Sequence, residues 1–291
     1  MSGRAITAGM TTAALDVIST AACLPGAAPD PEALGPLCVA CGVGVDSVAM
    51  LVGMWRRGIR PDLITFADTG GEKPETYAYI PILRAWLASV GFPDLVIVRY
   101  AGKHGRYSTL EGNCIANKTL PRLAFGGKGC SLKFKTAPQN AYRAKWGPAR
   151  AAWKAGFKVR VAIGYDNGKS DGRRSKLKET KRYTYVYYLR EWGWDRERCK
   201  AEILAAGLPV PMKSACWFCP ANKVAEIEYL DDHHPELADR VIAMEDNASP
   251  NLKTIQGLWR CGCKGTRGSV AKPGSMAVFI RARRALRVVQ A

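Results

Sequence analysis

The sequence predicts an α/β protein with a doubly wound, mostly parallel sheet and helices on both faces, followed by a basic C-terminal extension that contains cysteines. Short apolar strands alternate with longer helical patterns, which is typical of parallel sheets covered on both sides. Turns rich in glycine and aspartate follow the strands, and open parallel sheets bind ligands at that end. The 291 residues, 47% of them hydrophobic, suffice for one large domain with an extension.

Each expected strand is a short apolar run, and the first helices have clear end signals. The helix after the first strand stops at Gly58 and Pro61, and the next has Pro74 in its first turn. The expected strands are Leu37–Ala40, Asp62–Phe66, Asp94–Arg99 and Lys158–Ile163. The expected helices are Asp46–Trp55, Lys73–Val90, Ala137–Trp146, one within residues 186–209, and an acidic one around Glu226–Leu230. Residues 168–185 are expected to form a basic, mobile loop.

These elements divide the chain into three regions. Residues 1–35 are expected to form a helix and linker, 36–170 a nucleotide-binding core, and 171–291 a Cys-rich, basic C-terminal region. No apolar run of about 18 residues occurs, and Asp16 interrupts the apolar N-terminal segment. We therefore expect a cytoplasmic protein with no membrane partner.

The positive charge is concentrated in two blocks. The formal net charge is +18, and residues 101–200 alone hold 24 Lys and Arg against 7 Asp and Glu. Residues 251–291 hold nine basic residues and no acidic ones, whereas 201–250 are acidic. Blocks of one sign indicate a surface that faces a polyanion such as nucleic acid, with a merely solvated basic surface as the alternative.

The stretch from Val39 to Met50, VACGVGVDSVAM, places a glycine turn between a strand and a helix. It lacks the lysine of a Walker phosphate loop and the third glycine of a dinucleotide fingerprint. Backbone N–H groups in such a turn, together with the helix N-terminus, favour a bound anion. An ordinary strand–turn–helix connection is the alternative.

With the residues that follow it, this turn resembles the pyrophosphate loop of the phosphoadenosine phosphosulfate reductase-like family. Gly42, Gly44, Asp46 and Ser47 match the Gly-rich Asp-Ser loop of that family, and Val43 replaces a glycine. That replacement costs little if φ of Val43 is negative and loosens the loop if φ is positive. Further matches are the turn at residues 66–70, the turn at 163–166 with basic residues after it, and the Cys- and Lys-containing segment 130–135. The resemblance covers about residues 36–260.

The resemblance implies ATP or another adenine nucleotide as a ligand, together with a set of contacting residues. The implied nucleotide-binding residues are Gly42, Val43, Gly44, Val45, Asp46, Ser47, Asp68, Thr69, Gly70, Gly164 and Tyr165. The implied catalytic residues are Asp46, Lys133, Arg173 and Arg174.

Ten cysteines are many for a chain in a reducing compartment, and they favour metal or redox chemistry over disulfides. An exported disulfide protein is the competing interpretation. Cys216 and Cys219 form a C-x-x-C motif followed by Pro220, a spacing that lets two thiolates reach one metal or cluster. Cys130 and Cys199 are the expected partners. A [4Fe-4S] cluster, which the family resemblance implies, a structural zinc site and free buried cysteines are the three alternatives.

Three functions compete. The first is ATP-dependent adenylation and sulfur transfer on DNA or RNA, with an iron–sulfur cluster and a sulfur or electron donor protein. The second is a sulfonucleotide reductase in which Cys261 or Cys263 attacks sulfur. The third is a non-catalytic nucleic-acid-binding protein with a zinc site.

The first function explains the basic blocks, and it predicts a basic face around the nucleotide pocket. The lysines and arginines expected there are Lys128, Lys133, Lys135, Arg173, Arg174, Lys176 and Lys178, extended by Arg281, Arg283, Arg284 and Arg287. Aromatic residues among them either stack on unpaired bases or pack against the core; these are Tyr183, Tyr185, Tyr187, Tyr188, Trp192 and Trp194.

Overall fold

The centre of the molecule is a five-stranded sheet in which all neighbouring strands are parallel. The structure is a computed structural model that describes residues 35–102, 105–262 and 273–290. The strand order is β3-β2-β1-β4-β5. The strands are β1 (Leu37–Ala40), β2 (Leu63–Asp68), β3 (Leu95–Arg99), β4 (Val159–Ile163) and β5 (Tyr183–Val186). The predicted α/β class is confirmed.

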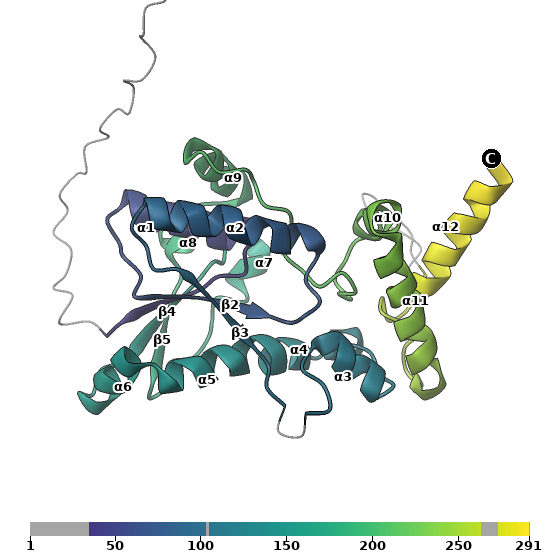
Figure 1. The fold of residues 1–291 in the computed structure, drawn as a ribbon, viewed down its shortest axis with the longest axis horizontal. Helices are drawn as coiled ribbons and strands as arrows, with labels where there is room; N and C mark the ends of the chain where they lie inside the picture. Colours follow the sequence, from purple (N-terminus) through teal and green to yellow (C-terminus); the bar gives the residue numbers. More distant parts are fainter. Residues whose placement is uncertain (1–34, 103–104, 263–272, 291) are drawn as a thin grey trace, which may run out of the picture.

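Helices cover both faces of this sheet (Figure 1). One face carries α1 (Val45–Arg56), α2 (Pro74–Ser89), α8 (Tyr188–Glu191) and α9 (Arg196–Ala205), and the other carries α5 (Ala137–Lys145) and α6 (Gly147–Lys154). The larger core lies under α1, where residues such as Met50 and Leu51 are fully buried with Phe66 of β2. The short helices α3 (Leu110–Ala116), α4 (Gly129–Ser131) and α7 (Lys169–Gly172) lie in connections.

Two elements differ from the prediction after residue 170. The expected basic loop at 168–185 contains α7 and most of β5. The sheet therefore extends beyond residue 170, which we had predicted as the end of the nucleotide-binding core. The helix expected within residues 186–209 is two helices, α8 and α9, because Gly193 adopts a left-handed φ of 68° between them. The expected N-terminal helix and linker lie outside the described residues, apart from Gly35.

A separate group of helices packs beside the sheet: α10 (Val224–His233), α11 (Pro235–Ala248) and α12 (Met276–Gln290) (Figure 1). The prediction had no helix at α12. Glu245 of α11, which is buried, accepts hydrogen bonds from the backbone N–H groups of Met276 and Ala277 and from the Ser275 hydroxyl. This carboxylate therefore caps the N-terminus of α12 and supplies the acceptor that its first turn lacks.

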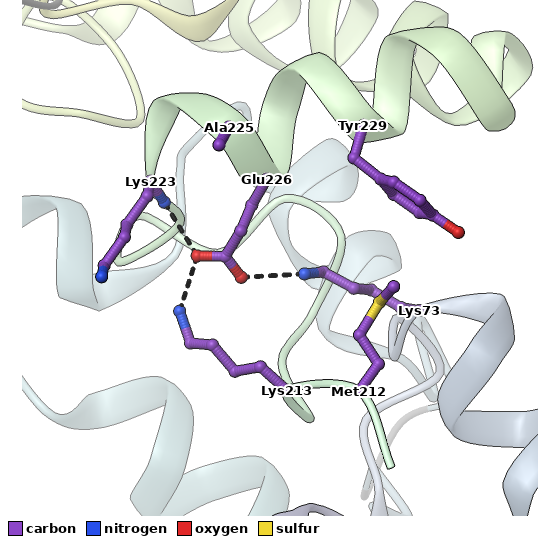
Figure 2. Close-up of a pocket in the computed structure, with 7 residues that line it drawn as sticks. All are labelled: Lys73, Met212, Lys213, Lys223, Ala225, Glu226 and Tyr229. Atoms are coloured by element: carbon purple, nitrogen blue, oxygen red, sulfur yellow. Dashed lines mark hydrogen bonds and ion pairs between the residues drawn. The ribbon is translucent and has the colours of Figure 1, made fainter. Parts of the chain in front are cut away.

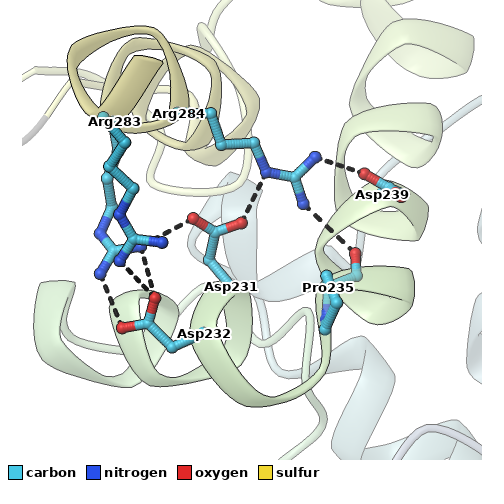
Figure 3. A network of polar contacts seen from close by, with 7 residues as sticks. Asp231, Asp232, Pro235, Asp239, Arg283 and Arg284 are labelled. Atoms are coloured by element: carbon cyan, nitrogen blue, oxygen red, sulfur yellow. Dashed lines mark hydrogen bonds and ion pairs between the residues drawn. The ribbon is translucent and has the colours of Figure 1, made fainter. Parts of the chain in front are cut away.

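The C-terminal arginines do not extend a basic face as predicted. Arg283 and Arg284 both bind Asp231, and Figure 3 shows them reaching from α12 to the acidic side of α10 and α11. Further ion pairs join Arg283 to Asp232, Arg284 to Asp239, Arg287 to Asp232 and Arg281 to Asp246. Their charge is therefore largely neutralised within the molecule, where it attaches α12. Among the described residues, no helix is long and apolar enough to cross a membrane.

Candidate nucleotide and cysteine sites

The turns singled out in the sequence meet at one edge of the sheet. Ala40 and Ile163, the last residues of β1 and β4, pair with each other; Ala40 also pairs with Thr65 of β2, which runs on to Asp68 at the same edge. The turns that follow them hold residues 41–44, 69–72 and 164–168. This edge is the carboxyl end of the strands, where ligands bind in open parallel sheets.

The glycine turn directs backbone N–H groups at a single point. Gly42 and Gly44 donate to the Ser47 Oγ at 3.2 and 3.3 Å, and that hydroxyl donates back to the Gly44 carbonyl at 3.0 Å. Helix α1 starts at Val45, directly after the turn. Converging N–H groups at a helix N-terminus form a concavity suited to phosphate oxygens.

Val43 is the strained residue of this turn. Its φ is 58°, in the left-handed region that a β-branched residue rarely adopts, and its side chain is fully buried in the core. The positive φ is the case in which we expected a looser loop. Here burial of the Val43 side chain opposes the strain, which is of the order of 1–2 kcal/mol.

Gly164 brings the turn after β4 against the start of α1. A Cβ on Gly164 would lie 2.9 Å from the backbone of Asp46 and Ser47, so only glycine fits there. Tyr165 stacks on Tyr187 with ring centroids 5.8 Å apart, and the Arg174 guanidinium lies 4.6 Å from the Tyr165 ring. Arg173 is exposed nearby, at the end of α7.

Three carboxylates cluster beside the glycine turn. Asp46, Asp166 and Asp171 each offer an oxygen, and these oxygens lie within 4.8 Å of one another. Arg196 donates to Asp46 at 2.8 Å and lies 3.5 Å from Asp166. The pKa of Asp46 is raised to about 6, chiefly by burial; Arg196 lowers it in part, and Asp166 and Asp171 contribute to the rise. Carboxylate oxygens at a phosphate site suit a divalent cation such as Mg²⁺. The sequence pointed to Asp46 alone; Asp166 was visible only as part of a turn.

The turn after β2 is held by its own side chains. Asp68 accepts hydrogen bonds from Gly70 N, Tyr77 OH and Arg99 Nε, at 2.8, 2.7 and 2.9 Å. Thr69 lies 3.2 Å from both Glu72 Oε1 and Cys216 Sγ. Asp68 and Thr69 are both buried, so their described role is to shape this turn. Their contact with a nucleotide stays a prediction.

The C-x-x-C segment crosses this same edge. The Trp217 N–H donates to the Gly71 carbonyl at 2.9 Å, and Glu72 and Cys216 form an isolated bridge. Burial raises the pKa of Cys216 and of Cys219, and Cys130 adds to the shift at Cys219. The structure therefore brings Cys130, Cys216 and Cys219 into one neighbourhood at the end of β2.

Cys199 is not part of that neighbourhood, and its assignment as the fourth ligand is wrong. It is fully buried between α9 and α1, in the larger core on the face of the sheet that carries these helices. Burial raises its pKa to about 12, and the charges that act on it next are those of Asp46 and Asp166. Cys114 packs in the same cluster as Cys130 and Cys216, and burial with Cys130 raises its pKa to about 12. Cys114 is the better-placed fourth thiol.

Lys135, rather than Lys133, points to the cysteine site. Lys133 donates to the Tyr107 hydroxyl and to Asn113, at 2.6 and 3.0 Å, and lies over the Tyr100 and Tyr107 rings. Lys135 donates to Glu72 Oε1 at 3.0 Å, and its charge lowers the pKa of Cys216 and Cys219 against the effect of burial. The other oxygen of this buried glutamate, Oε2, has no hydrogen-bond partner among the described residues.

The spacing of the thiols bears on which metal centre they fit. Among the described residues, the aspartate cluster is the one group of three such ligand atoms within 4.8 Å, so the three cysteine sulfurs are spread more widely. Zinc–sulfur bonds of about 2.3 Å in a tetrahedron place sulfurs about 3.8 Å apart. A cluster of several iron atoms spans a wider thiol set and fits this arrangement better.

Comparisons with known proteins found no match to a family model and none to a curated protein. Among solved structures, the U34-tRNA thiolase NcsA from Methanococcus maripaludis with its [4Fe-4S] cluster aligns over 85% of this chain and 82% of its own. The sequence identity is 13% and the TM-score 0.40. A likeness at this level carries no inference about substrate or chemistry.

Proposed function

We propose that this chain is an adenine-nucleotide-dependent enzyme that adenylates a nucleic-acid substrate beside a cysteine-bound iron–sulfur cluster. One observation carries the proposal: the segment 213–219 joins the two sites. Ser214 packs on the glycine turn, since a Cβ on Gly44 would lie 3.1 Å from the Ser214 Cβ. Two residues later, Cys216 lies against Thr69 at the end of β2. The phosphate loop and the thiols therefore share one edge of the sheet.

The chain's own groups fit the chemistry of adenylyl transfer. The N–H groups of Gly42 and Gly44, which donate to the Ser47 hydroxyl in this structure, would turn to phosphate oxygens when a nucleotide binds. Asp46 with its neighbouring aspartates would hold a divalent cation that offsets the phosphate charge. An acceptor oxygen attacks the α-phosphorus, the bond to the bridging oxygen breaks, and pyrophosphate leaves. Sulfide-level sulfur from a donor then attacks the activated carbon, and the C–O bond breaks to release AMP. Arg173, which is exposed, and Arg174, which pairs with Asp171 at 2.9 Å, would offset the charge of the pyrophosphate leaving group.

A [4Fe-4S] cluster bound by Cys130, Cys216 and Cys219 would supply a centre for sulfur or electron transfer beside the nucleotide.

The positive charge of the region after β4 supports a nucleic-acid substrate. Arg173, Lys176 and Lys178 are exposed in a segment with few acids, although Tyr188 and Trp194 of the same region are buried and belong to the core. Cys261, the candidate nucleophile of a reductase, is exposed, and no described contact joins it to the glycine turn. Cys263 lies outside the described residues.

Anaerobic purification with iron, sulfide and zinc analysis, followed by incubation with ATP, inorganic sulfide as the sulfur donor and an oligonucleotide, tests the proposal. We expect iron and sulfide in the protein and formation of AMP and pyrophosphate that requires the oligonucleotide. Zinc without AMP formation would favour a nucleic-acid-binding protein. Sulfite release from a sulfonucleotide that Cys261→Ser abolishes would favour the reductase. Arg173→Glu and Arg174→Glu should weaken oligonucleotide binding, whereas Arg281→Glu should not.

A further inference from the structure

A pocket lies beside the candidate nucleotide site, between the N-termini of α2 and α10 (Figure 2). It has a volume of about 370 Å³, at the lower end of the range for small-molecule sites. Its lining consists of Lys73, Met212, Lys213, Lys223, Ala225, Glu226 and Tyr229. Lys73 and Lys223 are the residues that precede α2 and α10, so two helix N-termini converge on it.

The charge of the pocket is positive. Glu226 sits between lysines and accepts from Lys73 Nζ at 2.9 Å, from Lys213 Nζ at 2.8 Å and from the Lys223 backbone N–H at 3.0 Å. Although burial raises the pKa of Glu226, these hydrogen bonds hold it at about 2, so the carboxylate is ionised. The Lys73 and Lys213 ammonium groups bind this single carboxylate, and Lys223 adds a third positive charge to the lining. The Lys223 ammonium has no ion-pair partner among the described residues, and in Figure 2 it points away from Glu226.

The walls supply an apolar surface beside those charges. Met212, Ala225 and the Tyr229 ring line the pocket. The orientation of Tyr229 is fixed by a 2.9 Å hydrogen bond to Glu75, which also lies 2.7 Å from His234 Nε2. An aromatic ring next to cations suits a group that carries both a planar base and a phosphate. Lys213 adjoins Ser214 on the glycine turn, and Lys73 adjoins Glu72 at the cysteine site.

We propose that this pocket binds one unpaired nucleotide of the nucleic-acid substrate, with its base against Tyr229 and Met212 and its phosphate on Lys213 and Lys223. The inference rests on the proposed function and adds to it a second site, distinct from the ATP phosphate loop. The nucleic-acid strand would then lie beside Lys213 and Lys73. In the protein chain these lysines adjoin Ser214 at the glycine turn and Glu72 at the cysteine site. Glu226 pairs with both Lys73 and Lys213 and leaves the Lys223 ammonium for phosphate.

Anisotropy titration of a labelled single-stranded oligonucleotide, over a range of salt, tests the site in the full chain. Lys223→Gln removes one charge and breaks no described contact, whereas Lys154→Gln removes the same charge from exposed α6 on the far side of the sheet. We expect Lys223→Gln to weaken binding about threefold or more and to reduce the log–log salt slope by about 0.7, with no effect from Lys154→Gln. Tyr229→Leu should weaken binding about 5- to 100-fold, and Tyr229→Phe, which keeps the ring, should not.

Binding of an ATP analogue, measured on the same variants, separates this site from the phosphate loop. We expect the affinity for the ATP analogue to stay at the wild-type level in all of these variants. Equal oligonucleotide affinity in Lys223→Gln and Lys154→Gln would overturn the inference while AMP formation from ATP still supported the proposed function. Parallel loss of ATP-analogue and oligonucleotide binding would also overturn it, because the pocket would then belong to the ATP site. Wild-type protein that neither binds the oligonucleotide nor forms AMP would contradict the proposed function itself.

Discussion

Ser214 packs directly on Gly44: a Cβ on that glycine would lie 3.1 Å from the Ser214 Cβ. A residue of the cysteine segment therefore covers the residue that precedes α1. A side chain at Gly44 must therefore displace Ser214 or extend toward the N–H groups of the glycine turn.

Gly44→Val should lower the affinity for ATP at least tenfold while the protein stays folded, because the branched side chain occupies the phosphate concavity. Gly147→Ala is the matched control, since a Cβ there meets nothing within 4 Å. The double change Gly44→Ala with Ser214→Gly should bind better than Gly44→Ala alone. Isothermal titration with a non-hydrolysable ATP analogue measures all of these, and unchanged affinity in Gly44→Val would rule out the phosphate loop.

At position 43, the usual order of stability of alanine and glycine variants should be reversed. In ordinary backbone, glycine is less stable than alanine by about 0.5–1 kcal/mol. At a φ of 58°, glycine removes a strain of about 1–2 kcal/mol that alanine retains in part. We therefore expect Val43→Gly to unfold at a higher urea concentration than Val43→Ala, with both below wild type because a buried side chain is lost. A glycine variant less stable than the alanine variant would show that Val43 is not strained.

Asp46 should make the stability of the nucleotide-free protein depend on pH. Its pKa is raised from 3.8 to about 6 on folding, so the folded state binds more protons than the unfolded state between these values. The contribution of Asp46 to stability therefore falls as pH rises from about 4 to 6. The difference in melting temperature between wild type and Asp46→Asn, measured across this range, isolates the effect. Mg²⁺-dependent ATP affinity should change the opposite way and rise with pH, because the ionised carboxylate is the ligand.

Substitution of the clustered cysteines should reduce bound iron. Cys130→Ser, Cys216→Ser and Cys219→Ser should each lower iron and sulfide per chain after anaerobic purification, because cluster ligation requires thiolates. Cys199→Ala is the control, since Cys199 lies in the other core and should leave the iron content unchanged. Cys114→Ser tests the fourth position. Loss of iron in Cys199→Ala with none in Cys216→Ser would contradict the site.

Asp231 should be the strongest attachment of α12. Its side chain is 1% exposed and binds both Arg283 and Arg284, so Asp231→Ala leaves two arginines without this partner. We expect a loss of roughly 2–3 kcal/mol in the free energy of unfolding, below that of a fully buried pair because Arg284 is 35% exposed. Arg281→Ala breaks a pair whose two side chains are each 53% exposed, and it should cost much less than Asp231→Ala. Urea unfolding compares the two.

The sequence by itself determined four of the five strands and the position of the glycine turn. The periodicity and end signals that define β1, α1, β2 and α2 are local. Residues such as Pro74 and Gly44 therefore specify these elements independently of long-range contacts. The C-x-x-C spacing is local as well. β5 escaped prediction because it is a short, half-buried edge strand within a basic run, without the apolar pattern of the others.

Only the tertiary structure decided which distant residues meet. Cys199 and Cys114 look alike in the sequence, but α9 packs its cysteine against α1 while α3 packs its own against the thiol cluster. Arg283 was expected on a basic face, but the docking of α12 pairs it with Asp231. Lys223 had no predicted role, and the start of α10 leaves its ammonium at an open pocket. The physical reason is the same in both cases: a side chain's partners depend on how whole helices bury their apolar faces, and no local pattern encodes that packing.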